Sequence, residues 1–99
     1  MTSVVYTAGA LEDLDRLTDF LVETNPPSAS DTAAIIGRAL MMLEEHPYIG
    51  RPVNGDLREL VISRGRTGYV ALYVYREALD TVLILAVRHQ RESGLGDQA

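Results

Sequence analysis

The most informative stretch of this sequence is TVLILAVRHQRESG, residues 81–94. Residues 82–87 are all apolar and rich in β-branched or bulky aliphatic side chains, which favours a strand. The run does not alternate with polar residues, so we predict a strand near the middle of a sheet, covered on both faces. It ends abruptly in a polar, mostly cationic cluster that begins at Arg88. Charge at a strand end often marks a binding site, although Arg88 and Arg91 also fit ordinary solvated charges.

Two further strands precede this stretch. Residues 57–62 and 69–76 are β-prone, and the short links between the last three strands predict an antiparallel meander. Alternation along residues 69–76 places one row of mostly aromatic side chains on a single face of the sheet: Tyr69, Ala71, Tyr73 and Tyr75. That row suits either a surface covered by a partner or the completion of a small core.

Helical periodicity dominates the first half of the chain. Thr7 can cap the start of a first helix, and this helix is expected to end at the segment NPP, residues 25–27. Ser28 or Ser30 can cap a second helix that stops before residue 47. The apolar stripes are Ala10, Leu14, Leu17 and Leu21 in the first helix, and Ala33, Ile36, Leu40 and Leu43 in the second.

These elements, together with a β-prone segment at residues 3–7, give the order β-α-α-β-β-β. The predicted fold class is α+β, with a helical hairpin packed on one face of an antiparallel sheet. Gly37 in the second helix would let a neighbouring element approach closely. The length of 99 residues suits one domain, which we place at residues 1–94, followed by a frayed tail at 95–99.

The charge of the chain limits the classes of partner. The formal net charge is −5, and all nine cations are arginine. An acidic protein is not drawn to nucleic acid by its overall field, so we expect no direct sequence-specific nucleic-acid binding. A genome biased against lysine codons accounts for the missing lysines, but arginine still offers a bidentate fork for carboxylate or phosphate.

Composition also limits location and chemistry. No apolar run is long enough to span a bilayer, and the N-terminus lacks a secretory pattern, so we expect a cytoplasmic protein without a membrane partner. Cysteine is absent, which excludes disulfides and thiolate chemistry. His46 and His89 lack companions at ligand spacing, so we expect neither a metal site nor a cofactor. No phosphate loop or nucleophile motif is present, and His89 remains a possible general base.

Five short segments, in order and spaced across nearly the whole chain, resemble the RelE/ParE superfamily of toxins from type II toxin–antitoxin modules. They are ALEDL at 10–14, HPYIGRP at 46–52, LREL at 57–60, GYVALY at 68–73 and ILAVRHQR at 84–91. The resemblance implies the same β-α-α-β-β-β architecture and a cognate antitoxin. It also implies toxic activity when the antitoxin is lost.

This superfamily has two mechanisms. RelE-like members cut messenger RNA on the ribosome with basic residues and often a late tyrosine, whereas ParE-like members poison DNA gyrase. Here Val70 stands where RelE-like toxins often carry arginine, and Leu95 stands in place of the late tyrosine. The HQR segment at 89–91 also looks ParE-like. We therefore favour a ParE-like gyrase inhibitor that forms a hetero-oligomeric complex with a ParD-like antitoxin. The alternatives are a RelE-like mRNA endonuclease and a non-toxic relic that only binds the antitoxin.

The resemblance and the residue pattern together suggest two sets of site residues. The antitoxin is expected to use an apolar helix face, with carboxylates for the arginines of this chain. Candidate contacts with the target are Arg64, Arg66, Arg88, His89 and Arg91; in the RelE-like alternative, His89, Arg91 and Arg88 would be catalytic. Candidate contacts with the antitoxin are Leu14, Leu17, Leu21, Arg58, Tyr73 and Tyr75.

Overall fold

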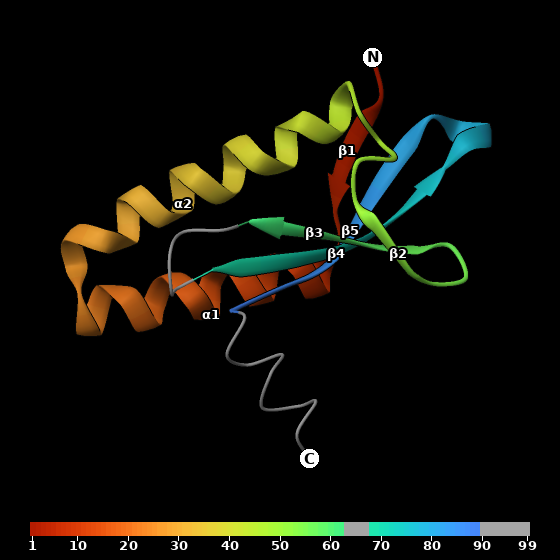
Figure 1. The fold of residues 1–99 in the computed structure, drawn as a ribbon. Helices are drawn as coiled ribbons and strands as arrows, with labels where there is room; N and C mark the ends of the chain where they lie inside the picture. The colour runs from red at the N-terminus through yellow and green to blue at the C-terminus, as the bar shows by residue number, and fades with distance from the viewer. Residues whose placement is uncertain (63–67, 90–99) are drawn as a thin grey trace.

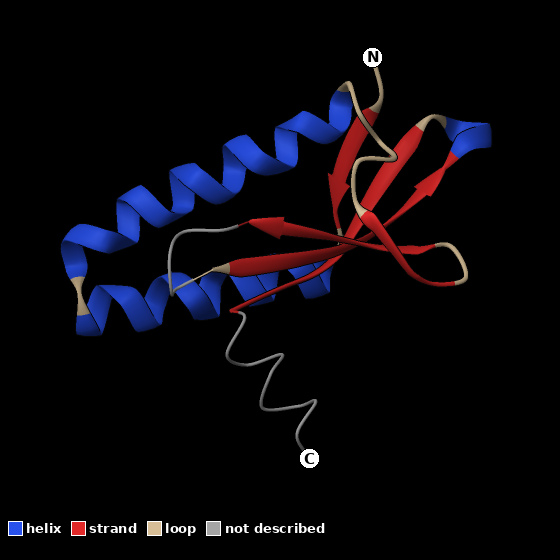
Figure 2. Cartoon of the chain, viewed as in Figure 1, coloured by secondary structure: helices blue, strands red, loops and turns tan. Residues whose placement is uncertain are grey.

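The computed structural model describes residues 1–62 and 68–89. Its elements confirm the predicted α+β class, with two helices joined near residue 25 and diverging beside a sheet (Figures 1 and 2). The predicted domain end at 94 and the tail at 95–99 lie outside the described residues. The elements are β1 (Ser3–Tyr6), α1 (Ala8–Thr24), α2 (Pro26–Met41), the 3₁₀ helix η1 (Met42–Glu44), β2 (Arg51–Asn54), β3 (Leu57–Ile62), β4 (Tyr69–Arg76), the 3₁₀ helix η2 (Glu77–Leu79) and β5 (Thr81–His89).

The sheet has five strands in the order β1-β5-β4-β3-β2. Strands β3 to β5 form the predicted antiparallel meander, and β2 extends it by pairing antiparallel with β3. The prediction of an entirely antiparallel sheet is wrong in one pairing, because β1 runs parallel to β5, with Ser3 opposite Thr81 and Tyr6 opposite Ile84. Two helices separate β1 from the next strand in sequence. In the sheet, β5 has β4 on one side and β1 on the other, so β1 forms the edge.

Strand β2 occupies a segment in which the sequence pattern predicted no strand. It pairs with β3 at one edge of the sheet, with Arg51 opposite Glu59 and Pro52 opposite Arg58. All four of its residues are exposed, so they show none of the alternation that marks a half-buried strand. Pro52 lacks a backbone donor, which is tolerated on an edge strand. Gly55 takes a positive φ of 56° in the turn to β3.

An irregularity in the pairing of β4 with β5 fixes the position of α1. Leu72 pairs with Ala86, whereas Tyr73 pairs with Ile84, so β5 carries one extra residue, Leu85, at this point. The carboxylate of Asp13 in α1 accepts a hydrogen bond from the backbone N–H of Val87 just beyond the bulge, at 3.0 Å. The N–H of Val87 thereby gains a hydrogen-bond partner from α1, as a buried backbone donor requires.

The two helices begin by different means. The Oγ1 atom of Thr7 accepts a hydrogen bond from the N–H of Ala10 at 3.3 Å, which confirms Thr7 as the cap of α1. The second helix starts earlier than predicted, at Pro26, and has no side-chain cap, so the predicted caps Ser28 and Ser30 lie inside it. Proline is favoured in the first turn of a helix because its missing N–H would have no intrahelical partner there.

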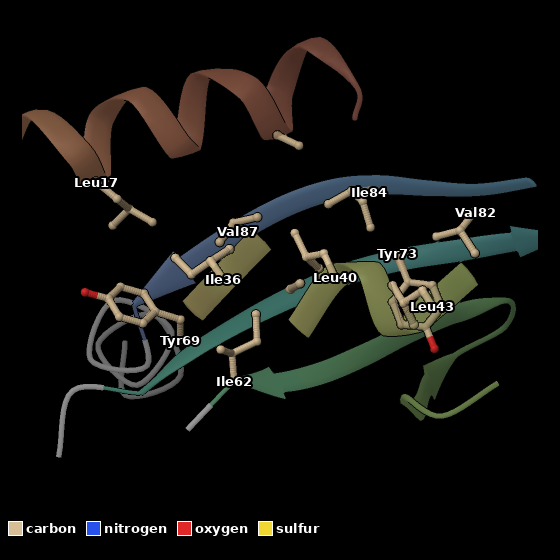
Figure 3. Packing of buried hydrophobic residues seen from close by; sticks show 12 residues of the cluster. Leu17, Ile36, Leu40, Leu43, Ile62, Tyr69, Tyr73, Val82, Ile84 and Val87 are labelled. Carbon is tan, nitrogen blue, oxygen red and sulfur yellow. The ribbon is translucent and has the colours of Figure 1, made fainter. Parts of the chain in front are cut away.

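One core lies between the helices and the sheet (Figure 3). Tyr69 and Tyr73 belong to it, with exposed fractions of 4% and 0%. Of the two interpretations of the tyrosine row, core completion is therefore correct for these two residues. The core cluster comprises Ala10, Leu17, Ile36, Leu40, Leu43, Ile62, Tyr69, Ala71, Tyr73, Val82, Ile84 and Val87.

The other face of the sheet is aliphatic at its centre. Because Tyr69, Ala71 and Tyr73 face the core, alternation places Val70, Leu72 and Val74 of β4 on the opposite face. Leu83 of β5 pairs with Val74 and adjoins the same face. This face, named the open face because it points away from the helices, is thus formed by branched side chains, and Val70 and Val74 on it are buried, with exposed fractions of 5% and 8%.

Candidate functional site: the groove between the helices

A mostly apolar groove of about 320 Å³ lies between α1 and α2. The first helix lines it chiefly with leucines, and the second helix with small residues. Ala29, Ala33 and Gly37 recur every four positions and so form one ridge of α2. Their short side chains leave the groove open. The full lining is Tyr6, Leu11, Leu14, Leu17, Thr18, Leu21, Ala29, Thr32, Ala33, Ile36 and Gly37.

Three predicted antitoxin contacts fall in this groove. Leu14 and Leu21 are half-buried in its wall, whereas Leu17 is 8% exposed and forms part of the core beneath. Leu11, which is 51% exposed, also lines the groove, although it was not among the predicted antitoxin contacts. Gly37 corrects another expectation, because a Cβ built there would meet nothing within 4 Å. Gly37 therefore opens a surface instead of allowing an internal element to approach.

Tyr73 does not have the predicted role of an antitoxin contact, because its side chain is fully buried. Its hydroxyl donates to the carbonyl of Pro47 at 2.9 Å and accepts from the N–H of Gly50 at 2.8 Å. Burial raises the pKa of this phenol. A Cβ at Gly50 would lie 2.6 Å from the Tyr73 ring, so this glycine is required by close packing. Tyr73 holds the loop between α2 and β2 against the sheet.

Arg58 and Tyr75 lie in a second hollow of about 500 Å³, away from the helix groove. Nη1 of Arg58 donates to the carbonyls of Tyr48 at 3.1 Å and Gly50 at 2.7 Å, and the guanidinium lies 4.9 Å from the centre of the Tyr48 ring. Tyr48 in turn meets Tyr75 edge-on at 5.1 Å. The hydrogen bonds of Arg58 support the loop. The structure thus divides the predicted antitoxin contacts between two separate places.

Asp80 joins the N-terminus to the turn between β4 and β5. Its Oδ1 accepts hydrogen bonds from the hydroxyls of Thr2 at 2.6 Å and Tyr75 at 2.7 Å. The hydrogen bond from Thr2, followed by that from Tyr75, lowers the pKa of Asp80. The hydrogen bond to Asp80 is in turn the largest cause of the raised pKa of Tyr75. Asp80 also takes a left-handed conformation with a φ of 48°, which asparagine tolerates equally well.

The Asp80 network predicts an acid-dependent stability. The pKa of Asp80 is lower in the folded protein than its unfolded value of 3.8. Asp80 therefore contributes to the free energy of unfolding above that value, and this contribution is lost as pH falls through the folded pKa. We expect the wild-type protein to lose more stability between about pH 5 and about pH 2 than Asp80→Asn. Urea unfolding at a series of pH values measures this difference. The exposed pair Asp56–Arg76 provides the control, Asp56→Asn, which should keep the wild-type dependence. An identical acid slope in the wild type and Asp80→Asn would contradict the assignment.

The predicted target-binding cluster at the end of β5 is only partly within the described residues; Arg64, Arg66 and Arg91 lie outside them. Arg88 and His89 occupy successive positions of a strand and therefore point to opposite faces of the sheet. His89 contacts the buried ring of Tyr69 edge-on at 5.1 Å, on the helix side. Arg88 is exposed and pairs across the ladder with Val70 of the open face. The two residues do not converge on one site.

Within residues 1–62 and 68–89, no group of three or more potential metal ligands occurs. None of the described helices is long and apolar enough to cross a membrane.

Comparison with known proteins agrees with this architecture. Residues 4–94 match the family described as "ParE toxin of type II toxin-antitoxin system, parDE". The chain is 34% identical over 92 residues to Toxin RelE3 of Caulobacter vibrioides, covering 93% of this chain and 98% of that protein. It is 35% identical over 89 residues to Toxin RelE2 of the same organism, covering 90% and 96%.

Solved structures show the same fold. A chain from the chromosomal ParDE system of Pseudomonas aeruginosa aligns with a TM-score of 0.75 at 24% identity, covering 90% of this chain and 96% of that one. A chain of the toxin–antitoxin complex RelBE2 from Mycobacterium tuberculosis aligns with a TM-score of 0.59 at 30% identity, covering 89% and 96%. The small α+β fold with a helical hairpin on its sheet is thus that of RelE/ParE toxins. This chain belongs to the ParE toxin family of type II toxin–antitoxin systems.

Proposed function

We propose that this toxin is ParE-like: it inhibits DNA gyrase in the cytoplasm and is neutralised by a ParD-like antitoxin in a hetero-oligomeric complex. The observation that carries the proposal is the separation of Arg88 from His89 on opposite faces of β5. RNA cleavage requires a proton-transfer group and charge stabilisation at the same phosphate. Inhibition by binding requires only a complementary surface on a stable fold, and the exposed side chain of Arg88 is compatible with that role.

A second candidate function is ribosome-dependent cleavage of mRNA. It is favoured by the relatives named as RelE toxins, at 34% and 35% identity. The described part of the open face argues against it, because Val70 and its neighbours Leu72 and Val74 cannot donate hydrogen bonds to a phosphate. Loss of one preorganised donor typically lowers a rate by about a hundredfold or more.

Two assays with the purified protein separate these functions. In the first, the protein is added to gyrase and relaxed plasmid; we expect inhibited supercoiling or trapped, cleaved DNA in the absence of ribosomes. In the second, it is added to ribosomes translating a defined mRNA, and we expect the mRNA to stay intact. Codon-specific cleavage of the ribosome-bound mRNA together with full gyrase activity would instead favour the mRNA endonuclease.

His89→Phe gives an independent test in cells. Phenylalanine retains an aromatic edge for Tyr69 but cannot accept or donate a proton, so it removes a general base while the ring contact remains. We expect growth arrest by induced His89→Phe to match the wild type within about threefold in inducer dose, because the proposed function uses no acid–base chemistry. A loss of toxicity in a variant whose melting temperature and antitoxin binding are unchanged would favour the endonuclease.

Arg88, one of the proposed target contacts, is exposed. Arg88→Ala should change the free energy of unfolding by about 0.5 kcal/mol or less, because surface substitutions usually have small effects. Gyrase inhibition should nevertheless weaken clearly, since arginine contacts often dominate an interface. The matched control is Arg76→Ala, an exposed arginine paired with Asp56 at the far end of β4, which should retain inhibition. Equal inhibition by both variants would remove Arg88 from the working surface.

The antitoxin is proposed to dock in the groove between α1 and α2. This surface is mostly apolar, has a volume of about 320 Å³ and includes the exposed side chain of Leu11. An amphipathic helix laid into a groove of this kind buries a row of side chains at helical spacing. Leu14 and Leu21 retain their predicted role as contacts in this proposal.

A further inference from the structure

The wide end of the groove between the helices is closed by β1. The two helices diverge from their junction near residue 25, and β1 lies between their far ends (Figure 1). At one end of β1, the N–H of Thr2 donates to the carbonyl of Glu44 in η1, at 3.1 Å. At its other end, Tyr6 directly precedes Thr7, the cap of α1, and lines the groove. The groove therefore contains a tyrosine among its leucines and small residues.

The side chain of Tyr6 lies on the helix side of the sheet. Val4 and Tyr6 are alternate residues of β1, and both pack against the core cluster. Tyr6 is only partly buried, as expected for a residue that lines an open groove. Burial nevertheless raises the pKa of its phenol. The hydroxyl therefore stays protonated and can donate a hydrogen bond.

The hydroxyl of Tyr6 has no role in holding the free toxin together. It forms no hydrogen bond with another residue of the ranges 1–62 and 68–89, and solvent reaches its oxygen. The hydroxyls of Tyr73 and Tyr75, in contrast, bind the loop after α2 and the carboxylate of Asp80. The Tyr6 hydroxyl is thus a polar group in a mostly apolar groove, available to an occupant.

An occupant that covers Tyr6 has to replace the solvent around its hydroxyl. Burial of a hydroxyl against apolar atoms without a hydrogen bond is unfavourable. The O–H group needs an acceptor, because a partner that only donates to the oxygen would leave the proton unsatisfied. Backbone carbonyls within a helix are already hydrogen-bonded four residues along the chain. In a docked helix, the acceptor is therefore a side-chain oxygen.

We infer that the antitoxin helix in this groove carries one hydrogen-bond acceptor side chain within its apolar stripe, opposite Tyr6. The acceptor is an amide, hydroxyl or carboxylate oxygen. This inference rests on the proposed docking of the antitoxin in the groove, and it makes Tyr6 a specificity-determining contact. A helix that is entirely apolar on this side, or that is shifted along the groove, would bury the hydroxyl without a partner and bind less tightly.

The test measures the affinity of Tyr6→Phe for the antitoxin co-expressed from the adjacent reading frame and purified. The variant keeps the ring and removes one oxygen. We expect binding to weaken by roughly 5- to 100-fold by calorimetry, because the acceptor of the antitoxin is then buried without a donor. The melting temperature of the free toxin should not fall, since the hydroxyl has no partner among the described residues.

Two results would overturn the inference. Equal or tighter binding by Tyr6→Phe is the result expected for an entirely apolar stripe, which gains from the loss of the hydroxyl. A clearly lower melting temperature of the free variant would show that the hydroxyl is bonded within the toxin. Tyr48→Phe is the matched control, because Tyr48 is 49% exposed and lies outside the groove lining. It should bind the antitoxin like the wild type.

A double-mutant cycle identifies the acceptor. Each polar residue within the apolar stripe of the antitoxin is replaced by alanine and combined with Tyr6→Phe. One replacement should be clearly non-additive with Tyr6→Phe, because both remove the same hydrogen bond. Additivity for every one of these residues would contradict the inference.

Gly37→Leu keeps the inference apart from the docking proposal on which it rests. This change fills the groove without altering Tyr6. If Gly37→Leu blocks binding and Tyr6→Phe does not weaken it, the groove stands and the acceptor fails. If Gly37→Leu leaves binding intact, the docking groove itself fails.

Discussion

Replacing Tyr73 by alanine should lower the free energy of unfolding by about 3–5 kcal/mol, the usual range for removing a large buried aromatic side chain. Tyr73 has no exposed surface, and it lies in the core with Leu40 and Leu43. Small domains are stable by only about 5–15 kcal/mol, so this variant should be folded marginally at best. Urea unfolding followed by circular dichroism measures the change.

Tyr73→Phe isolates the contribution of the hydroxyl. The ring remains, but the carbonyl of Pro47 and the N–H of Gly50 lose their partner. Leaving a buried polar group unsatisfied typically costs about 1–3 kcal/mol. Tyr75→Phe is the matched control, because Tyr75 is only partly buried and its hydroxyl binds Asp80 at the sheet end instead of the loop. Unchanged stability of Tyr73→Phe would show that the hydroxyl does not hold the loop.

Gly50→Ala should also lower the free energy of unfolding, because Gly50 is the other partner in the contact with Tyr73. Its new methyl group would lie 2.6 Å from the ring and from the hydroxyl of Tyr73, both of which are fixed by packing. Overpacking of this kind costs about 1–3 kcal/mol. The double variant Gly50→Ala/Tyr73→Phe should be non-additive, since both changes act on one contact.

Gly37→Leu should weaken the complex with the antitoxin by roughly 10- to 100-fold. The leucine would project into the groove, where the free toxin has nothing within 4 Å of the Cβ position, and would fill space that the partner needs. Steric overlap of about 1–3 kcal/mol converts to that range, because each ~1.4 kcal/mol is a factor of ten in affinity.

The same variant should be more stable than the wild type when free. Glycine inside a helix is less favourable than leucine or alanine by up to about 1 kcal/mol, and no clash opposes the new side chain. A toxin that melts higher but binds its antitoxin less tightly is not the result of misfolding. Calorimetry measures the affinity, and thermal unfolding measures the stability.

Two controls accompany Gly37→Leu. Gly37→Ala should gain most of the same helix stability, but it adds only one methyl group and should bind the antitoxin nearly normally. Arg38→Leu places a leucine on the next position of α2, outside the groove lining, and should leave affinity within a few-fold of the wild type. Full affinity of Gly37→Leu would mean that the antitoxin docks elsewhere. In cells, loss of neutralisation by a co-expressed antitoxin should accompany the loss of affinity.

The sequence by itself determined the family and the local elements apart from β2 and the start of α2. The aliphatic run at 82–87 predicted a central strand, and β5 lies between β4 and β1 in the sheet. The periodic leucines of α1 predicted a buried stripe, because an amphipathic helix of a soluble domain must cover its apolar side. The five quoted segments predicted the superfamily that the comparisons then showed.

Only the tertiary structure decided how those elements meet. Alternation gave Tyr69 and Tyr73 a common face, but whether that face was core or partner surface depended on where the helices packed. The cluster after residue 87 looked like one site, yet Arg88 and His89 lie on opposite faces of β5. The groove with Gly37 at its rim and the parallel pairing of β1 arise from contacts between segments far apart in sequence. Periodicity determines which side chains share a face, whereas the face that is covered is determined by long-range packing that no local pattern contains.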